Sequence, residues 1–329
     1  MAQRPSEVVS GSPDQPVSVH LSVSVVEGYE AAKSQAKRPS GAPMIAIQSK
    51  FMHFAAKIYQ ALDNFFPREG RWYLFGSHLA LVFIAWQFYG LQRTTEQIAL
   101  AYVAAILVEY VGFRLTAKYT GRSFWKDRAF SAASEAAGLL VLVRASGTET
   151  YAIMAAIAVA SKYLFRIDDK GHAFNPTNFA IVLGLLIFPK TIFDVRSDEF
   201  ALHLHPILHV VAFGVLATWR GNSWMITLSY FAMLALGSAI LPNISGENFL
   251  YHFAPEIGAI GMVFAWLMIT DPRTTPRERP WQILFGASVA AVMLALRLGE
   301  VFYAEFIALF IVTTIRTIWL LRVPELRSS

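Results

Sequence analysis

The chain lacks cysteine altogether, and this absence excludes several kinds of site. None of its 329 residues can form a disulfide, a thiolate zinc site or a cysteine-ligated iron–sulfur cluster. Any electrons that pass through the chain would therefore need a flavin, a quinone or haem. Haem within a membrane is commonly held by paired histidines, and the eight histidines form no convincing pair of that kind.

Charge is also scarce. Only 16% of the residues are charged, whereas a soluble domain carries roughly 25%. Hydrophobic residues make up 55% of the chain, and they gather in runs close to the roughly 20 residues that cross a bilayer core. The basic residues lie between these runs, which argues against nucleic-acid binding. The composition predicts an all-α integral membrane protein in contact with the lipid bilayer.

We expect about ten transmembrane helices within 71–322. The apolar runs lie at 73–91, 97–115, 129–144, 149–165, 175–189, 203–219, 223–241, 250–270, 281–297 and 301–321. The third and fifth runs are short for a span. Short spans need a packed interior that satisfies their backbone ends, so they tend to line a site.

The charges of the loops give an orientation. Eighteen Lys and Arg residues flank the spans on one side, against five on the other. Such a bias marks the basic side as cytoplasmic. It predicts an even number of spans, both termini in the cytoplasm, and a location in the bacterial inner membrane.

The terminal regions differ from the apolar part. Residues 1–48 are rich in Ser, Pro, Gln, Lys and Glu and predict a disordered cytoplasmic tail, although Val17 to Val26 alternates as a short strand would. Residues 49–70 predict an amphipathic helix, either at the membrane surface or packed on the protein's own cytoplasmic face. Residues 323–329 predict a second cytoplasmic tail.

Two segments that join neighbouring spans differ from ordinary loops. The first carries SKYLFR at 161–166 and HAFNPTNF at 172–179, and the second carries ITDPRTTP at 269–276 and QILFG at 282–286. Asn175-Pro176 predicts a helix start, whose free N–H groups could hold a carboxylate, a phosphate or a polarised carbonyl. Asp271-Pro272 predicts a helix end and a turn. The plain alternative is that both segments are only caps and turns at span ends.

These two motif segments resemble the NqrB/RnfD family of membrane proteins, found in the sodium-pumping NADH:quinone reductase (Nqr) and in the Rnf electron-transport complex. Those proteins share a K-Y-L-F-R … H-x-F-N-P segment and a later T-D-P … T-x-P … F-G segment, in the same order and topological place. The resemblance covers roughly 73–321 and is closest to stand-alone members, some of which lie beside enediyne-biosynthesis genes. It implies two inverted five-helix repeats, similar to urea and ammonium channels, and other membrane or redox subunits as partners.

One departure from that family concerns its cofactor. The family carries FMN covalently on the threonine of an S-G-A-T motif after the F-N-P span, and this chain has no such tetrapeptide. Its nearest run, at 146–148, lies before that span. The resemblance therefore implies no covalent FMN, and it leaves a non-covalent flavin (riboflavin or FMN) or a quinone as the expected cofactor.

We expect a binding site where the helix start at 175–176 approaches the turn at 270–275. The candidate cofactor-binding residues are Lys162, Arg166, His172, Asn175, Thr177, Asn178, Thr270, Asp271, Arg273 and Thr274.

Several carboxylates fall within apolar runs, where a charge costs about 2.5–3.5 kcal/mol on insertion scales. Glu135, in the short third span, is the best candidate for a proton or cation site, followed by Glu109 and Glu256. Structural ion pairs between helices are the alternative. His205 and His209 lie one helical turn apart, as metal ligands can, but we favour interfacial histidines and predict no metal site.

Three functions are compatible with these features. The first is an electron-transport subunit, which would be an electron-transfer or non-catalytic part of a membrane oxidoreductase. The second is a small-molecule or ion transporter or channel without redox chemistry. The third is an accessory protein that positions other enzymes. A shared fold does not choose among them.

Overall fold

The computed structural model describes residues 57, 71–116, 124–167, 171–195 and 203–322. The chain divides into two compact units, Met1–Pro67 and Arg68–Ser329. The predicted tails at 1–48 and 323–329 lie outside the described residues, as does the predicted amphipathic helix at 49–70 apart from Lys57. The second unit carries the helices and the candidate site.

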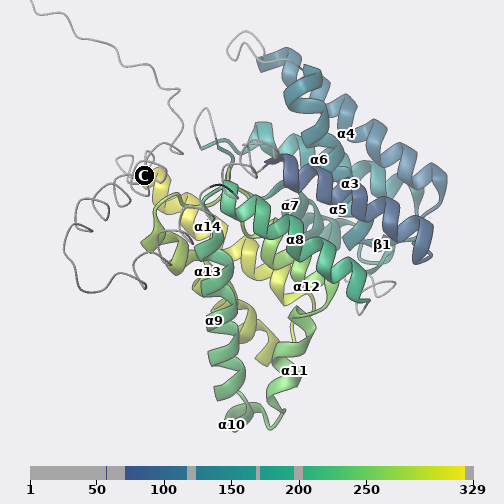
Figure 1. Cartoon of the computed structure of the whole chain (residues 1–329). Helices are drawn as coiled ribbons and strands as arrows, with labels where there is room; N and C mark the ends of the chain where they lie inside the picture. Colours follow the sequence, from purple (N-terminus) through teal and green to yellow (C-terminus); the bar gives the residue numbers. More distant parts are fainter. Residues whose placement is uncertain (1–56, 58–70, 117–123, 168–170, 196–202, 323–329) are drawn as a thin grey trace, which may run out of the picture. The chain divides into compact units, whose positions relative to one another are not determined.

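Helices occupy each of the ten apolar ranges of the second unit (Figure 1). In chain order they are α3 (Arg71–Phe88), α4 (Thr95–Thr116), the π-helical turn η2 (Phe124–Ala129) with α5 (Phe130–Leu142), α6 (Thr148–Leu164), α7 (Pro176–Ile187), α8 (Leu204–Arg220), α9 (Trp224–Ile240) with α10 (Pro242–Ser245), the series α11 (Phe249–Phe253), η4 (Ala254–Glu256), α12 (Ala259–Val263) and η5 (Phe264–Met268), then α13 (Arg279–Leu298) and α14 (Ala304–Arg322). Of the two helices predicted to be short, α7 has 12 residues. Helix α5 has 13 residues, but the 6 residues of η2 continue it directly at its start.

The chain is a helical, multi-pass membrane protein. Among the described residues, four helices are long and apolar enough to cross a bilayer: Thr95–Thr116, Trp224–Ser245, Arg279–Leu298 and Ala304–Arg322. A bent pair of helices within 249–268 brings the number to five if it counts as one span. The total of ten spans stays a prediction.

The range 250–270, predicted as one straight span, is broken. Its two parts, Phe249–Glu256 and Ala259–Met268, meet at 64°. Pro255 lacks the N–H that a continuous helix needs, and Gly258 adopts an extended backbone before α12. Broken helices within a membrane are tolerated where other protein or a cavity satisfies the exposed backbone.

A small sheet is a second departure from the expected all-α fold. The strands β1 (Arg144–Ala145) and β2 (Ile192–Asp194) pair antiparallel, with Arg144 opposite Asp194. Helix α5 accordingly ends at Leu142, before the predicted boundary at 144, because the chain turns there into the strand. The sheet joins the segment after α5 to the segment after α7.

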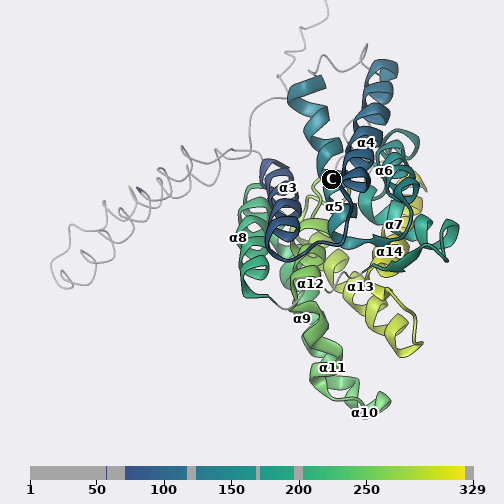
Figure 2. The same ribbon diagram turned by 90° about the vertical axis from the view of Figure 1, so that its right-hand side faces the viewer.

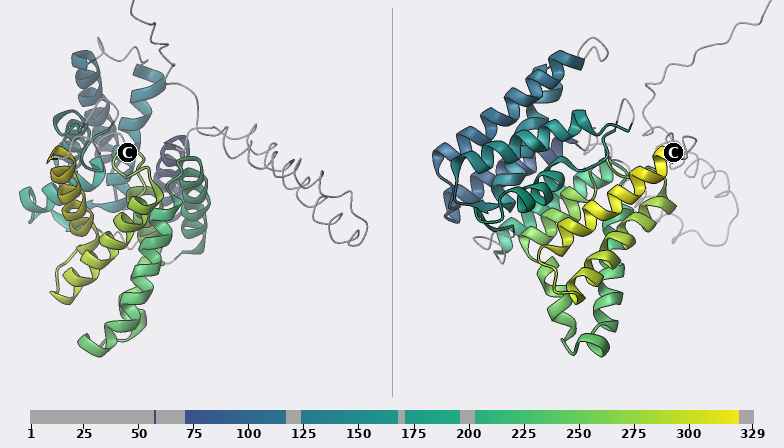
Figure 3. Two further views of the ribbon diagram at one scale, coloured as in Figure 1. Left: turned by 90° about the vertical axis from the view of Figure 1, so that its left-hand side faces the viewer. Right: turned by 180° about the vertical axis from the view of Figure 1, so that it is seen from behind.

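The helices of the second unit pack in a recurring pattern. The two most extensive contacts are between α4 and α6 and between α9 and α13. Helix α3 packs on α5, and in the same way α8 packs on α12 and η5. Helix α6 contacts α7, and likewise α13 contacts α14. Figure 2 shows α3 beside α8, and Figure 3 shows the neighbouring α13 and α14 from behind.

Close packing of α9 on α13 depends on Gly286. A Cβ atom at this position would collide with the backbone carbonyl oxygen of Ile226 and with the Ser229 hydroxyl. A backbone oxygen cannot rotate away as a side chain can, so the helices must separate to admit a methyl group.

We expect Gly286→Ala to destabilise the protein by about 1–3 kcal/mol, the usual cost of overpacking a core. The thermal unfolding midpoint of the purified chain in mild detergent measures this loss. Gly76→Ala in α3 is the matched control, because its Cβ would meet only Phe213 Cε1 at 3.8 Å, an ordinary contact. Equal midpoints for the two variants would contradict the close approach of α9 and α13.

Candidate functional site: two motif segments at a buried polar cavity

The start of α7 is a capped helix N-terminus, as predicted. Asn175 Oδ1 accepts the backbone N–H of Asn178 at 3.0 Å, and Pro176 occupies the first helical position. The Asn175 amide nitrogen also donates to the carbonyl of Met268 at 3.4 Å. This bond ties the start of α7 to the end of η5, so the two motif segments meet.

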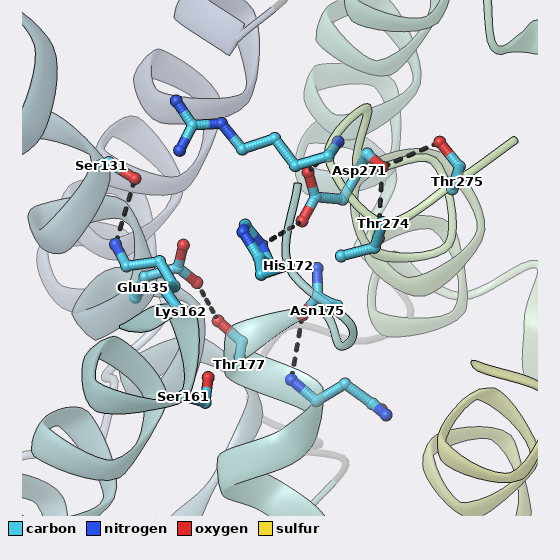
Figure 4. A network of polar contacts seen from close by, with 12 residues as sticks. Ser131, Glu135, Ser161, Lys162, His172, Asn175, Thr177, Asp271, Thr274 and Thr275 are labelled. Carbon is cyan, nitrogen blue, oxygen red and sulfur yellow. Dashed lines mark hydrogen bonds and ion pairs between the residues drawn. The ribbon is translucent and has the colours of Figure 1, made fainter. Parts of the chain in front are cut away.

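The turn after η5 is closed by its own hydrogen bonds. The Asp271 carbonyl accepts the Thr274 N–H at 3.0 Å and the Thr275 hydroxyl at 2.9 Å. Asp271 Oδ1 accepts the Arg273 N–H at 3.1 Å. These bonds leave the second carboxylate oxygen, Oδ2, facing His172 Nε2 across 3.6 Å (Figure 4).

Asp271 lies outside the membrane-spanning helices and is ionised at neutral pH. Burial acts to raise the pKa of its carboxyl group. The neighbouring His172, the backbone N–H of Arg273 and the charge of Arg273 lower this pKa and together outweigh burial. The net result is a pKa below the ordinary value for aspartate. A negative charge therefore stands at the junction of the two segments.

The junction lines a small cavity of about 60 Å³. Side chains from α3, α5, α7 and both motif segments surround it, and its polar lining consists of His78, Ser131, Ser134, Glu135, His172, Asn175, Thr177, Asp271 and Arg273. A water molecule occupies roughly 30 Å³ of the liquid, so this space suits a small ion or a water or two. Pockets for drug-sized ligands measure roughly 300–1,000 Å³. This cavity is smaller than that range.

A chain of buried polar contacts leads from the cavity into the helices. Thr177 donates its hydroxyl to Glu135 Oε2 at 2.8 Å, and both side chains line the cavity. Lys162 Nζ contacts the Ser131 hydroxyl at 3.3 Å. Figure 4 shows these side chains around the cavity.

Lys162 also forms the most deeply buried ion pair near the cavity. Its Nζ lies 2.7 Å from Oε2 of Glu109, whose side chain is 0% exposed. Tyr163 donates its hydroxyl to Glu109 Oε1 at 2.6 Å, and Arg128 lies 3.7 Å from the same oxygen. The pair joins α4 to α6 beside the cavity wall.

Several predicted residues are near the junction without lining the cavity. Thr270 donates to the Trp266 carbonyl, and Thr274 donates to the Asp271 carbonyl, so both hydroxyl groups stabilise local backbone. The Asn178 amide donates to the Phe306 carbonyl at 3.1 Å on α14. Arg166 is exposed, and its backbone forms an isolated bridge with His172.

Glu256 belongs to a different cluster. Its carboxylate contacts Arg297 at 2.6 Å and accepts the Tyr230 hydroxyl at 2.9 Å, while Arg297 lies 3.6 Å from Glu305. Arg297 and Glu305 line a separate cavity of about 950 Å³. Glu256 was a third candidate for a proton or cation site, with an interhelical ion pair as the alternative, and its contact with Arg297 is such a pair.

Three polar lining residues were missed from the sequence: His78, Ser131 and Ser134. His78 Nδ1 lies 2.8 Å from the Ser134 hydroxyl. The signal for the serines was their spacing, since positions 131, 134 and 135 share one face of a helix with Gly138. His78 could have been noticed as a polar residue within an apolar run.

The histidines at 205 and 209 contact hydroxyl groups of segments distant in the sequence. His205 Nδ1 lies 3.3 Å from the Tyr89 hydroxyl, and His209 Nε2 lies 3.4 Å from the Ser77 hydroxyl. Within the described residues, no group of three His, Cys, Asp or Glu side chains could hold a metal ion.

A comparison with protein-family models finds no match, and neither does a comparison with curated proteins.

Removing one partner of the Glu109–Lys162 pair should be costly. We expect Lys162→Met to destabilise the protein by about 3–5 kcal/mol, because the buried Glu109 carboxylate loses its close cation and keeps only the more distant Arg128. The double variant Glu109→Gln/Lys162→Met should recover much of this loss. The thermal unfolding midpoints of Glu109→Gln, Lys162→Met and the double variant give the interaction free energy between the two side chains.

Arg114→Met serves as the control for this cycle, because Arg114 is exposed at the end of α4 and a surface change typically stays within about 0.5 kcal/mol. Losses that simply add in the double variant would contradict the proposed pairing.

Proposed function

We propose that this protein moves protons or small cations across the bacterial inner membrane, and that it is related to the NqrB/RnfD family. The observation that carries the proposal is the group of ionisable side chains at and beside the cavity. Glu109 pairs with Lys162 beside the cavity wall, and Glu135, His172 and Asp271 line the cavity itself. Ionisable groups of this kind within a membrane typically mark ion pathways or proton relays.

The cost of burying charge supports this reading. If an ion pair had only a structural role, apolar side chains of similar volume in its place would stabilise the fold equally well. Here the Glu109–Lys162 pair is accompanied by two further acids and a histidine, and these three side chains line a cavity that suits a water or an ion. That grouping exceeds what packing alone requires.

The resemblance also favours a redox function, with a non-covalent flavin or quinone and other membrane or redox subunits. The size of the cavity argues against an isoalloxazine ring at the predicted residues. No step of the proposed transport therefore passes through a flavin, and electron transfer is the second candidate.

We further propose ten spans arranged as two inverted five-helix repeats, α3 to α7 and α8 to α14. The packing pattern supports this arrangement, because second-to-fourth, first-to-third and fourth-to-fifth helix contacts recur in each half. Contacts between α3 and α8 and between α7 and α14 join equivalent helices of the two halves. Because five is an odd number of spans, the second repeat begins on the opposite side of the membrane and is inverted relative to the first. The charges of the loops favour both termini in the cytoplasm.

Reconstitution of the full chain into liposomes tests the proposed transport. With an imposed membrane potential, we expect uptake of protons, followed by a pH-sensitive dye, or of sodium or potassium ions, followed by tracer. Glu135→Gln should lower the rate about tenfold or more, because a neutral amide removes the charge and the exchangeable proton. Asn175→Ala and Asp271→Ala should abolish transport while the chain still inserts.

Glu149→Gln is the matched control, since Glu149 is an exposed acid at the start of α6. Wild-type rates in all three site variants would show that the site is wrongly assigned. A wild-type rate equal to that of empty liposomes would contradict transport. Stoichiometric flavin or quinone released from denatured protein, seen by absorbance and mass spectrometry, would favour the electron-transfer candidate.

A further inference from the structure

An apolar groove lies between α13 and α14, apart from the site described above. It encloses about 330 Å³ and lies where α13 begins and α14 ends. Trp281, Leu284 and Phe285 form one wall, and Ile315 and Trp319 form the other. Leu284 and Ile315 are more than half exposed, so in a membrane the groove opens toward the lipid.

Two tryptophans frame the end of the groove. The rings of Trp281 and Trp319 lie 4.9 Å apart at 56°. Trp281 is in the first turn of α13 and Trp319 in the last turn of α14, so the pair marks one end of both helices. Tryptophan is enriched at the level of lipid headgroups, where its ring is partly apolar and its N–H meets polar groups.

Basic side chains gather at the same end. Arg316 lines the groove and donates from a guanidinium nitrogen to the Thr274 carbonyl at 3.0 Å. Arg277 and Arg279 are exposed at the start of α13, with the exposed Glu278 between them. Three arginines against one glutamate leave this rim net positive.

We infer that the groove binds an anionic phospholipid of the surrounding bilayer. One acyl chain would lie between α13 and α14, and the phosphate would meet Arg316 and the arginines at 277 and 279. Basic pockets between membrane helices on the cytoplasmic side are typical binding sites for anionic headgroups. The volume is also large enough for an apolar group of ligand size.

The inference does not depend on the proposed transport function. It does connect the groove with the turn after η5, because the carbonyl that Arg316 binds belongs to Thr274, three residues after Asp271. A lipid phosphate at Arg316 would therefore lie one hydrogen bond away from the turn that carries the Asp271 carboxylate.

Quenching of tryptophan fluorescence by brominated lipid tests this site. The full chain is placed in nanodiscs of phosphatidylcholine that contain a small share of phosphatidylglycerol. In one sample the acyl chains of phosphatidylglycerol carry bromine, and in the other those of phosphatidylcholine do. The contribution of Trp281 and Trp319 is the difference between the wild type and Trp281→Phe/Trp319→Phe. We expect phosphatidylglycerol to be enriched about fivefold over phosphatidylcholine at these two rings.

Arg277→Gln/Arg279→Gln should remove the preference for phosphatidylglycerol, and so should Ser288→Phe, which fills the groove from its wall. Arg114→Gln/Lys190→Gln is the matched control, because it removes two exposed basic residues that lie on neither α13 nor α14. The control should keep the wild-type preference. Equal quenching by both brominated lipids in the wild type would overturn the inference, and so would a preference that survives both groove variants.

Discussion

The ion pair between Glu109 and Lys162 is the interaction on which the site depends. A carboxylate that is 0% exposed inside a membrane protein is tolerable only when a cation and hydrogen bonds compensate the loss of water. Lys162 supplies the cation from α6, and Tyr163 and Arg128 supply the further contacts. Because Lys162 also reaches Ser131 on α5, this single pair fixes the relative positions of three helices at the wall of the cavity.

In the second half of the bundle, different residues compensate the burial of a carboxylate. There Glu256 is held by Arg297 of α13 and by the Tyr230 hydroxyl of α9. A cation and a phenol again hold the carboxylate, although Lys162 and Tyr163 of the first cluster both lie on α6. Each cluster lies beside its own cavity, a small one near Asp271 and a large one near Glu305. The two clusters differ in their backbone. The turn after η5 adjoins the first cavity, whereas Glu256 of the second cluster directly precedes the bend between the parts Phe249–Glu256 and Ala259–Met268. Among the described residues, buried charge beside a cavity thus occurs in both halves.

The sequence was most informative where local chemistry decides structure. Asn175-Pro176 predicted a capped helix start, and Asn175 does cap α7 through the Asn178 N–H. The apolar runs predicted the positions of the helices. The 64° bend was not predicted, although Pro255 and Gly258 are its cause, because hydropathy averages over such residues. Partners across helices could not be deduced either: nothing in a single chain indicates that Glu109 pairs with Lys162, or that Arg297 pairs with Glu256 and not with Glu300, since such pairs depend on packing between distant segments.

The segments around His172 and Asp271 meet at one site, and a cross-link between them tests this contact most directly. The chain has no cysteine, so a pair introduced at these two positions can be cross-linked without background. His172→Cys/Asp271→Cys, treated in membranes with a short thiol-to-thiol reagent, should give an intramolecular link that mass spectrometry locates between the two segments. His172→Cys/Tyr251→Cys, which joins residues of different cavities, should give none. A failure of the first pair to react, or equal yields from both pairs, would contradict the account.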